Sequence, residues 1–498
     1  MKKSAPLFFV FAITAFLLFT GSDLSAQNQG IAHGQRYDRL VIRNVTIIDG
    51  KGTPPRGPMD VILEGNKITA VRGANLRPDA YKAEKHVLNG TGMYLLPGFI
   101  NSHVHLQDER AGIPQPFEYE YKVWLSCGIT TIRDVGGDMK KIFAERRKSQ
   151  EGSIAAPRLY LYETAGGSTP EAVRASVRGL KEQGVDGIKI FGMDRDIMAA
   201  AVDEAKKLGL KVAHHMGVEE TDARDAAALG VATLEHWYGI PDAALRGSQN
   251  FPASYNYNNE SDRFRWAGRL WREADPEKLE EVLEAMIEKG VAWVPTFSTY
   301  VACRDMTRAR NLPWFKEYLH PTLEAYFPPS LNRHGAFSQG WSTEDEIAWK
   351  ENYRIWMKAA RDFADKGGLV GAGDDAGFIY TLYGFSFLEE LELLQEAGFH
   401  PIDVIECATG NNALIMGLEN ELGRVRPGFL ADLILIDENP LANLKYLFPT
   451  GVLDLKDGKE VVRGGVKWTI KDGIVYSTPT LMKDVRDMVA KAKAERKR

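Results

Sequence analysis

Two histidines, His103 and His105, flank a single valine in the apolar stretch LLPGFINSHVHLQ at residues 95–107. Side chains two positions apart in a β-strand lie on the same face, so both imidazoles can reach one ion. Imidazole is a frequent ligand of divalent metals. The pattern alone does not separate a metal site from two buried histidines with ordinary hydrogen-bond partners. The other polar residues of the chain must decide between these interpretations.

A lysine, Lys189, lies between two isoleucines in the short apolar stretch DGIKIFG at residues 186–192. If the isoleucines face outward, the amine points to the buried side of the strand, where an unpaired ammonium is costly. A neutral lysine amine can take up carbon dioxide as a carbamate, whose oxygens can bridge two metal ions. The alternative is an ordinary buried ion pair.

Three further histidines follow in two later stretches. GLKVAHHMG at residues 209–217 contains His214 and His215, of which strand alternation allows only one on the inner face. Counting along the strand favours His215 and leaves His214 as the alternative. TLEHWYG then adds His236 at the end of the next strand. Histidines that recur at successive strand ends are more typical of a metal site than of core packing.

Two carboxylates complete the set in GAGDDAG, residues 371–377, between a short apolar strand and glycines that permit close backbone approach. One of them could bind a metal and take up a proton, while the other could cap a helix. Imidazoles with carboxylates suit zinc, manganese or cobalt. Two such ions sharing a hydroxide would supply a nucleophile near neutral pH and polarise a carbonyl.

The elements that must position these residues alternate between strand and helix. Apolar runs such as TTIRDVGG and APRLYLYETAG are separated by helical stretches such as TPEAVRASVRGLKEQG. This alternation predicts parallel strands joined by crossover helices. The series continues to about eight units over residues 99–420, which predicts an α/β fold with a (β/α)8 TIM-like barrel. The active sites of such barrels lie at the C-terminal ends of the strands, where the candidate residues fall.

Both ends of the chain carry a different pattern. Residues 38–98 and 421–478 show near-alternating apolar residues with turns, which predicts one small β-sandwich domain built from both termini. Residues 237–276 and 300–345 do not fit a minimal barrel and are rich in aromatic residues. Long loops of this kind are usually functional, so we predict a lid over the substrate, with a satellite hydrophobic cluster as the alternative. Residues 479–498 form a predicted C-terminal helix and charged tail.

The N-terminus has the charged, apolar and small-residue regions of a secretory signal peptide over residues 1–26. It predicts an exported protein, periplasmic or secreted, cleaved after Ala26. An uncleaved anchor is the alternative, because Leu24 is a poor residue at the third position before the cut. No later segment approaches the ~20 apolar residues of a membrane span, so no stable span is expected after signal removal.

Composition narrows the class of protein. Hydrophobic residues make up 44% and charged residues 26%, which is typical of folded proteins. The formal net charge is -5 and the basic residues are spread along the chain, so no nucleic-acid partner is expected. Only Cys127, Cys303 and Cys407 occur, and we expect buried thiols and no disulfide framework. The sequence does not define the oligomeric state, and an oligomer is compatible with it.

The motifs LPGFINSHVH, GITTIRDVGG, GIKIFG, TLEHWYG, GAGDDAG and VVRGGVKWTIKDG occur in this order. With this set the chain resembles the metal-dependent amidohydrolase superfamily, and its inward lysine resembles the prolidase-like, binuclear subgroup. The resemblance covers nearly the whole mature chain. It implies the following ligands: His103 and His105 for the more buried metal, carboxylated Lys189 as the bridge, and His215 and His236 for the second metal.

The resemblance also implies a mechanism. Asp375 matches the aspartate of the family's GTDAG motif and is implied as metal ligand and general base, with His236 assisting orientation, while Asp374 takes a variable position. Asp134, at the end of TTIRD, is expected to support the site by a hydrogen bond. The implied reaction is attack of a metal-bridging hydroxide on an amide carbonyl, with Asp375 carrying the proton to the leaving nitrogen.

The implied activity is cleavage of amide C–N bonds in a small-molecule substrate, such as a dipeptide or an N-acyl amino acid. Two zinc ions, with manganese or cobalt as alternatives, would be the cofactors. A second interpretation is a mononuclear deaminase or cyclic amidine hydrolase, in which Lys189 would only form an ion pair. A third is a non-catalytic binding barrel, which has no physical need for so many costly inward polar groups.

Overall fold

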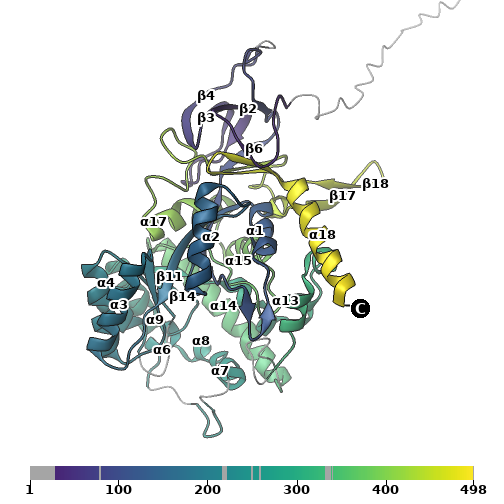
Figure 1. Cartoon of the computed structure of the whole chain (residues 1–498). Coiled ribbons are helices and arrows are strands. Elements are labelled where there is room, and N and C mark those ends of the chain that lie inside the picture. The colour runs from purple at the N-terminus through teal and green to yellow at the C-terminus, as the bar shows by residue number, and fades with distance from the viewer. Residues whose placement is uncertain are drawn as a thin grey trace, which may run out of the picture.

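The computed structural model describes residues 28–77, 80–215, 221–247, 251–256, 260–330, 338 and 340–496. The predicted signal peptide at residues 1–26 lies outside these ranges. Figure 1 shows a small β domain above a larger barrel surrounded by helices. Within the described residues, no helix combines the length and the apolar character that crossing a membrane requires.

Seven parallel strands form the wall of the barrel. In chain order they are β7(Phe99–Val104), β10(Ile129–Asp134), β11(Arg158–Thr164), β12(Gly187–Ile190), β13(Lys211–His214), β14(Thr233–Glu235) and β15(Ala292–Val294). Each strand pairs with the next one along the chain, as right-handed crossover connections require. This arrangement confirms the predicted TIM-like fold.

A short extended segment at residues 369–373 closes the barrel between β15 and β7. On one side the backbone NH of Trp293 donates to the Leu369 carbonyl over 2.9 Å, and on the other the NH of Ser102 donates to the Ala372 carbonyl over 3.1 Å. Asn412 ties the seam together, because its side-chain amide donates to the carbonyls of Ile100 and Ala372 at 2.6 and 2.7 Å. The eighth position of the barrel is therefore filled without a regular strand.

Helices follow the strands and cover the outside of the barrel (Figure 1). The eight that succeed the eight wall segments are α1(Phe117–Ser126), α2(Met139–Glu151), α3(Pro170–Gln183), α4(Arg195–Lys207), α5(Ala223–Leu229), α9(Pro276–Glu288), α14(Thr343–Asp365) and α15(Phe385–Glu396). Local sequence sets their ends. In α3, for example, the Thr169 side chain caps the first turn, proline occupies the first helical position, and Gly184 ends the helix in the left-handed conformation.

The β domain is one nine-stranded mixed sheet built from both ends of the chain. Its strands are β1(Gln35–Arg36), β2(Arg39–Ile47), β3(Arg56–Glu64), β4(Lys67–Gly73), β5(Val87–Asn89), β6(Tyr94–Pro97), β16(Leu433–Ile436), β19(Val466–Lys471) and β20(Ile474–Ser477). The pairing of β6 with β16 joins the two halves. The sheet buries its own apolar cluster, separate from the barrel core. Only Gly98 separates β6 from the first barrel strand.

The two predicted insertions contain short helices. Residues 237–276 include α6(Ile240–Ala243), α7(Glu260–Ala267) and α8(Leu270–Glu273), and residues 300–345 include α10(Val301–Arg304), α11(Met306–Arg310), α12(Phe315–Tyr318) and α13(Pro321–Tyr326). Many of their aromatic side chains join the main apolar core. At the start of each insertion, Tyr238 and Tyr300 share a hydrogen bond between hydroxyls at 2.9 Å.

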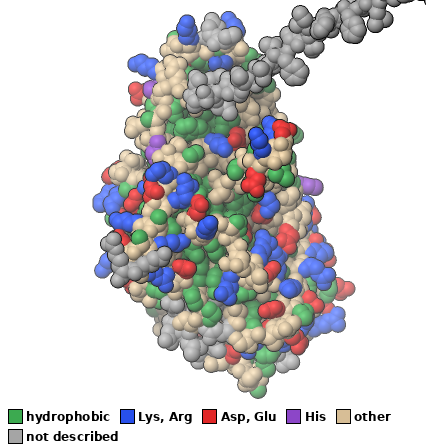
Figure 2. Space-filling view, turned by 90° about the vertical axis from the view of Figure 1, so that its right-hand side faces the viewer, with side chains coloured by type: hydrophobic (Ala, Val, Ile, Leu, Met, Phe, Trp, Pro, Cys, Tyr) green, Lys and Arg blue, Asp and Glu red, His purple; other side chains and the backbone are tan. Residues whose placement is uncertain are grey.

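The remaining elements lie on the periphery. They are the loop strands β8(Glu109–Arg110) and β9(Ile113–Pro114), helices α16(Pro401–Glu406) and α17(Asn412–Met416), the hairpin β17(Val452–Lys456) and β18(Lys459–Arg463), and helix α18(Thr478–Arg496). Helix α18 packs against α1 on the barrel. The surface in Figure 2 carries basic and acidic side chains interspersed with one another. All three cysteines are buried and free, as predicted.

Candidate metal centre

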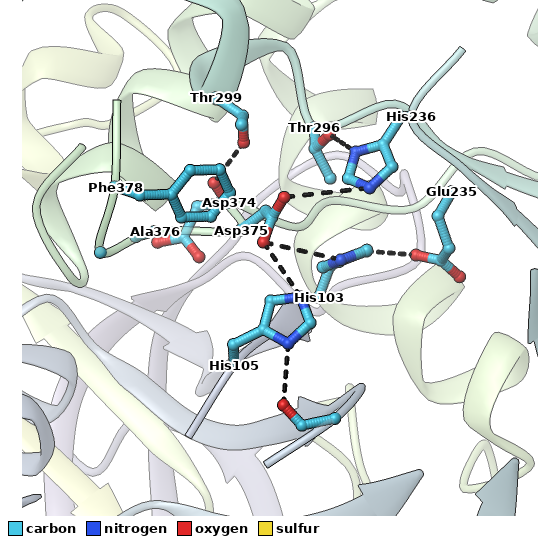
Figure 3. Close-up of polar contacts among 12 residues, drawn as sticks. His103, His105, Glu235, His236, Thr296, Thr299, Asp374, Asp375, Ala376 and Phe378 are labelled. Carbon is cyan, nitrogen blue, oxygen red and sulfur yellow. Dashed lines mark hydrogen bonds and ion pairs between the residues drawn. The ribbon is translucent and has the colours of Figure 1, made fainter. Parts of the chain in front are cut away.

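Four side chains from three barrel segments meet at the C-terminal end of the barrel. His103 and His105 extend from the end of β7, His236 directly follows β14, and Asp375 follows the closing segment. Each histidine directs Nε2 toward the Asp375 carboxylate (Figure 3). Oδ1 lies 3.3 Å from His105 and 3.8 Å from His103, and Oδ2 lies 3.8 Å from His236. The ligand atoms of His103, His236 and Asp375 all lie within 4.8 Å of one another.

The Nδ1 atom of each histidine in this cluster is held by a different partner. His105 Nδ1 donates to the Gly136 carbonyl over 2.9 Å, so its Nε2 carries the lone pair. His236 Nδ1 lies 2.6 Å from the Thr296 hydroxyl, and His103 Nδ1 lies 2.5 Å from a carboxylate oxygen. Burial lowers the pKa of His103 and His236 well below the usual value. The neutral imidazoles are therefore in the form that binds metal.

The backbone at this cluster adopts a rare conformation. His236, Thr296 and Asp375 have φ values of 64°, 52° and 45°, in the left-handed region that non-glycine residues seldom occupy. Such conformations cost free energy and persist where the surrounding structure holds them, often at functional sites. Here the NH of Asp375 is fixed by a 2.9 Å hydrogen bond to the His103 carbonyl.

The two adjacent aspartates face different surroundings. Asp374 accepts a 2.7 Å hydrogen bond from the Asn101 amide, and its carbonyl accepts another from Thr299 over 2.8 Å. Asp375 faces the histidines, and its Oδ1 has no hydrogen-bond partner. Burial raises the pKa of Asp374 to about 7 and that of Asp375 well above its usual value. The structure thus places Asp375, and not its neighbour, in the cluster.

Lys189 is completely buried on β12, and its Nζ has no hydrogen-bond partner among the described residues. Its neighbours Ile188 and Ile190 belong to the outer apolar core, as the alternation along the strand predicted. Burial lowers the pKa of Lys189, while the carboxylates of Glu235 and Asp375 raise it. The effect of burial is larger, and the resulting pKa is about 8. A lysine in this environment readily loses its proton.

The two adjacent histidines at the end of β13 have different surroundings. The ring of His215 lies 4.7 Å from that of His236, centroid to centroid, and 4.9 Å from that of Tyr238. His214 pairs in register with Ile190 and is completely buried, and neither of its ring nitrogens has a hydrogen-bond partner in the described ranges. Contact with His236 favours His215 as the ligand, and this choice stays a prediction.

The loop after His105 is held by the predicted supporting residue. Asp134 Oδ1 accepts a 2.9 Å hydrogen bond from the backbone NH of Leu106. Asp134 is completely buried, and burial raises its pKa well above the usual value. Its side chain therefore acts on the backbone of the ligand loop, and not directly on the cluster.

Comparison with known protein families decides the class. Residues 94–461 match the family described as the amidohydrolase family. The chain belongs to this family. This amidohydrolase is therefore a metal-dependent hydrolase that acts on carbon–nitrogen bonds, and the buried His103, His236 and Asp375 form its candidate metal site.

Individual relatives of this amidohydrolase are distant. It is 36% identical over 213 residues to a dihydroorotase of Thermus aquaticus, an alignment that covers 41% of this chain and 46% of that protein. It superposes on the crystal structure of a Xaa-Pro dipeptidase with bound methionine, with a TM-score of 0.61, 20% identity, and 88% of this chain and 100% of that chain covered. It also superposes on the crystal structure of A. niger ochratoxinase, with a TM-score of 0.59 and 18% identity. That superposition covers 89% of this chain and 96% of the ochratoxinase chain. At these identities the structural likeness shows the shared fold.

The residues of this amidohydrolase fit a divalent cation. Within the part of the chain that the structure describes, His103 Nε2, Asp375 Oδ1 and Lys189 Nζ are buried without hydrogen-bond partners. Buried polar atoms left unpaired cost free energy, and native proteins rarely keep several of them in one place. A bound metal ion would use His103 Nε2 and Asp375 Oδ1 as ligands. Imidazole with carboxylate is a donor set that suits zinc, manganese or cobalt.

Several residues around the cluster were missed by reasoning from the sequence alone. Glu235 contacts His103, Arg133 contacts Glu235, and Thr296 contacts His236. A signal did exist for the first two, because each is a charged residue inside an apolar strand, at an inward position by alternation. Thr296 lies in a loop where no periodicity applies.

Proposed function

We propose that this amidohydrolase is an exported, binuclear enzyme that cleaves amide bonds in small molecules such as dipeptides or N-acyl amino acids. The observation that carries the proposal is the convergence of three Nε2 atoms on Asp375, together with a fully buried lysine amine that has no hydrogen-bond partner among the described residues. The names of two structural relatives, a Xaa-Pro dipeptidase and an ochratoxinase, support hydrolysis of this kind. The signal-peptide pattern at residues 1–26 supports export.

In this proposal the ligands divide between two ions, with zinc as the first choice and manganese or cobalt as alternatives. His103 and His105 would hold one ion, His215 and His236 the other, and Lys189 would bridge them as a carbamate. The pKa of about 8 supports the last role, because only the neutral amine adds carbon dioxide. A pair of divalent ions supplies a water of lowered pKa and polarises the amide carbonyl.

The chain's own residues would then handle the proton and exclude water. Asp375 faces all three Nε2 atoms, and its raised pKa suits a carboxylate that takes up a proton and delivers it to the leaving nitrogen. Tyr238 and Tyr300 lie 5.7 and 5.8 Å from the His236 ring, centroid to centroid, and bond to each other. Since each begins one of the insertions, we propose that residues 237–276 and 300–345 cover the bound substrate.

A substrate panel tests this function. Metal-loaded protein would be assayed for amine release from dipeptides and N-acyl amino acids, and for ammonia release or ring opening with aminopurines and cyclic imides. We expect turnover of the acyclic amides, abolished by a chelator and restored by divalent metal. Turnover of only the cyclic or amidine compounds would favour the mononuclear alternative, and no turnover with metal bound would favour a binding barrel.

A further inference from the structure

We propose that Glu235 is the positioning residue that fixes the tautomer of His103 and so keeps its Nε2 available to a metal ion. An ion pair with Arg133 balances the charge of the Glu235 carboxylate. The inference rests on the metal centre proposed above and extends it to two residues that bind neither metal nor substrate. Both lie on barrel strands, Arg133 on β10 and Glu235 on β14.

The three side chains form a continuous hydrogen-bonded chain inside the barrel. Arg133 Nη2 donates to Glu235 Oε1 over 2.7 Å. His103 Nδ1 donates to the other carboxylate oxygen, Oε2, over 2.5 Å, and Figure 3 shows this second contact. Thr233 also donates to Oε1 through its hydroxyl, and Arg133 donates to the Ser102 carbonyl through Nε. His103, Arg133 and Glu235 are each at most 1% exposed. These contacts are therefore shielded from bulk water.

The direction of the His103 hydrogen bond follows from its partner. A carboxylate paired with an arginine accepts hydrogen bonds and donates none. The proton of neutral His103 must therefore lie on Nδ1, which leaves the lone pair on Nε2. Nε2 has no hydrogen-bond partner among the residues that the structure describes, and it lies 3.8 Å from Asp375 Oδ1. Glu235 thus selects the tautomer that can bind metal at the position facing Asp375.

The partners of the other two histidines have different properties. The Gly136 carbonyl fixes the tautomer of His105 but carries no charge. The Thr296 hydroxyl can donate or accept, so it holds the ring of His236 without selecting a tautomer. Of these three histidines, His103 is the one whose Nδ1 contacts a charged group, the Glu235 carboxylate. A carboxylate bonded to Nδ1 also raises the basicity of the imidazole. His103 should therefore depend on its partner more than the other two.

Glu235→Gln tests the proposal because it keeps the shape of the side chain but turns one acceptor into a donor. Since Arg133 and Thr233 both donate to the Oε1 position, the glutamine oxygen should stay there and its NH2 group should face His103. Two donors cannot share a hydrogen bond, so His103 must move its proton to Nε2 or lose the contact. We expect metal affinity to fall about 10–100-fold, the usual range for loss of such a partner.

A second substitution should reverse this effect. Adding Arg133→Met to Glu235→Gln lets the glutamine turn its oxygen toward Nδ1, because the Thr233 hydroxyl can accept from the amide. We expect the double variant to recover most of the lost metal affinity while being less stable than the single variant. If Arg133 and Glu235 only stabilised the fold, the double variant should bind metal more weakly than the single variant.

Metal content by elemental analysis, metal affinity by chelator competition and thermal unfolding would be measured for every variant. Glu389→Gln is the matched control, a buried glutamate on α15 outside the cluster, and should bind metal as the wild type does. Wild-type affinity in Glu235→Gln, or no recovery in the double variant, would overturn the proposal. Failure of the wild type to bind metal would instead overturn the proposed function.

Nitrogen-15 NMR of histidine-labelled, metal-free wild type provides a readout that needs no variant to fold. We expect the His103 proton on Nδ1. A proton on Nε2 would contradict the proposal even if every other result agreed with it, because the tautomer itself is the claim.

Discussion

Replacing Lys189 with alanine should remove one or both metal ions and lower the rate of amide hydrolysis by on the order of 10³-fold, since the two-ion site would lose several kcal/mol of transition-state stabilisation. The structural reason is that Lys189 is fully buried and its Nζ has no hydrogen-bond partner among the described residues. The Asp375 carboxylate is close enough to act on it electrostatically. Metal content by elemental analysis and rates on an N-acyl amino acid would measure the effect.

The β domain offers a matched control for this variant, on strand β19. Lys471 is also buried and has its pKa lowered to about 8, but its Nζ donates to the Ser149 carbonyl over 2.6 Å. Lys471→Ala should therefore cost stability and leave the metal content unchanged. Bicarbonate with a short carboxylate such as acetate should partly restore activity to Lys189→Ala by occupying the space of the carbamate. An unchanged rate and metal content in Lys189→Ala would refute the bridging role.

Asp375→Asn should lower kcat by about 10²–10⁴-fold, the range for loss of a general acid–base group, because the amide cannot take up the proton. The adjacent Asp374→Asn is the control, since its side chain is held by Asn101 outside the cluster and an amide oxygen can accept the same hydrogen bond. Steady-state kinetics and thermal unfolding would be compared for the two variants. A larger loss in Asp374→Asn than in Asp375→Asn would show that the two roles had been assigned the wrong way round.

Periodicity in the sequence was sufficient to predict the barrel and the sheet formed from both ends. Ile188 and Ile190 face the outer core and Lys189 the interior, as alternation requires. The closing segment at 369–373 was harder to recognise as part of the wall. Its bridge between Val370 and Trp293 is isolated, and the segment is too short for a pattern to be read.

The candidate site was predictable only where strand alternation applies. His103 and His105 lie on one strand, and their common direction followed from spacing alone. The adjacent His214 and His215 lie where β13 ends, so counting along the strand favoured His215 but left His214 as the alternative. Arg133 meets Glu235 and Thr233 inside the barrel, and Arg133 and Thr233 are 100 residues apart in the sequence. No local sequence pattern encodes a contact over this separation.

The central claim is that this amidohydrolase holds two divalent ions between His103, His105, Lys189, His215, His236 and Asp375. The most direct measurement is the metal-to-protein ratio of the active enzyme, determined by elemental analysis after reconstitution with zinc and removal of loosely bound ions. Our account predicts two ions per chain. A fully active enzyme with one ion per chain would contradict it and favour the mononuclear alternative.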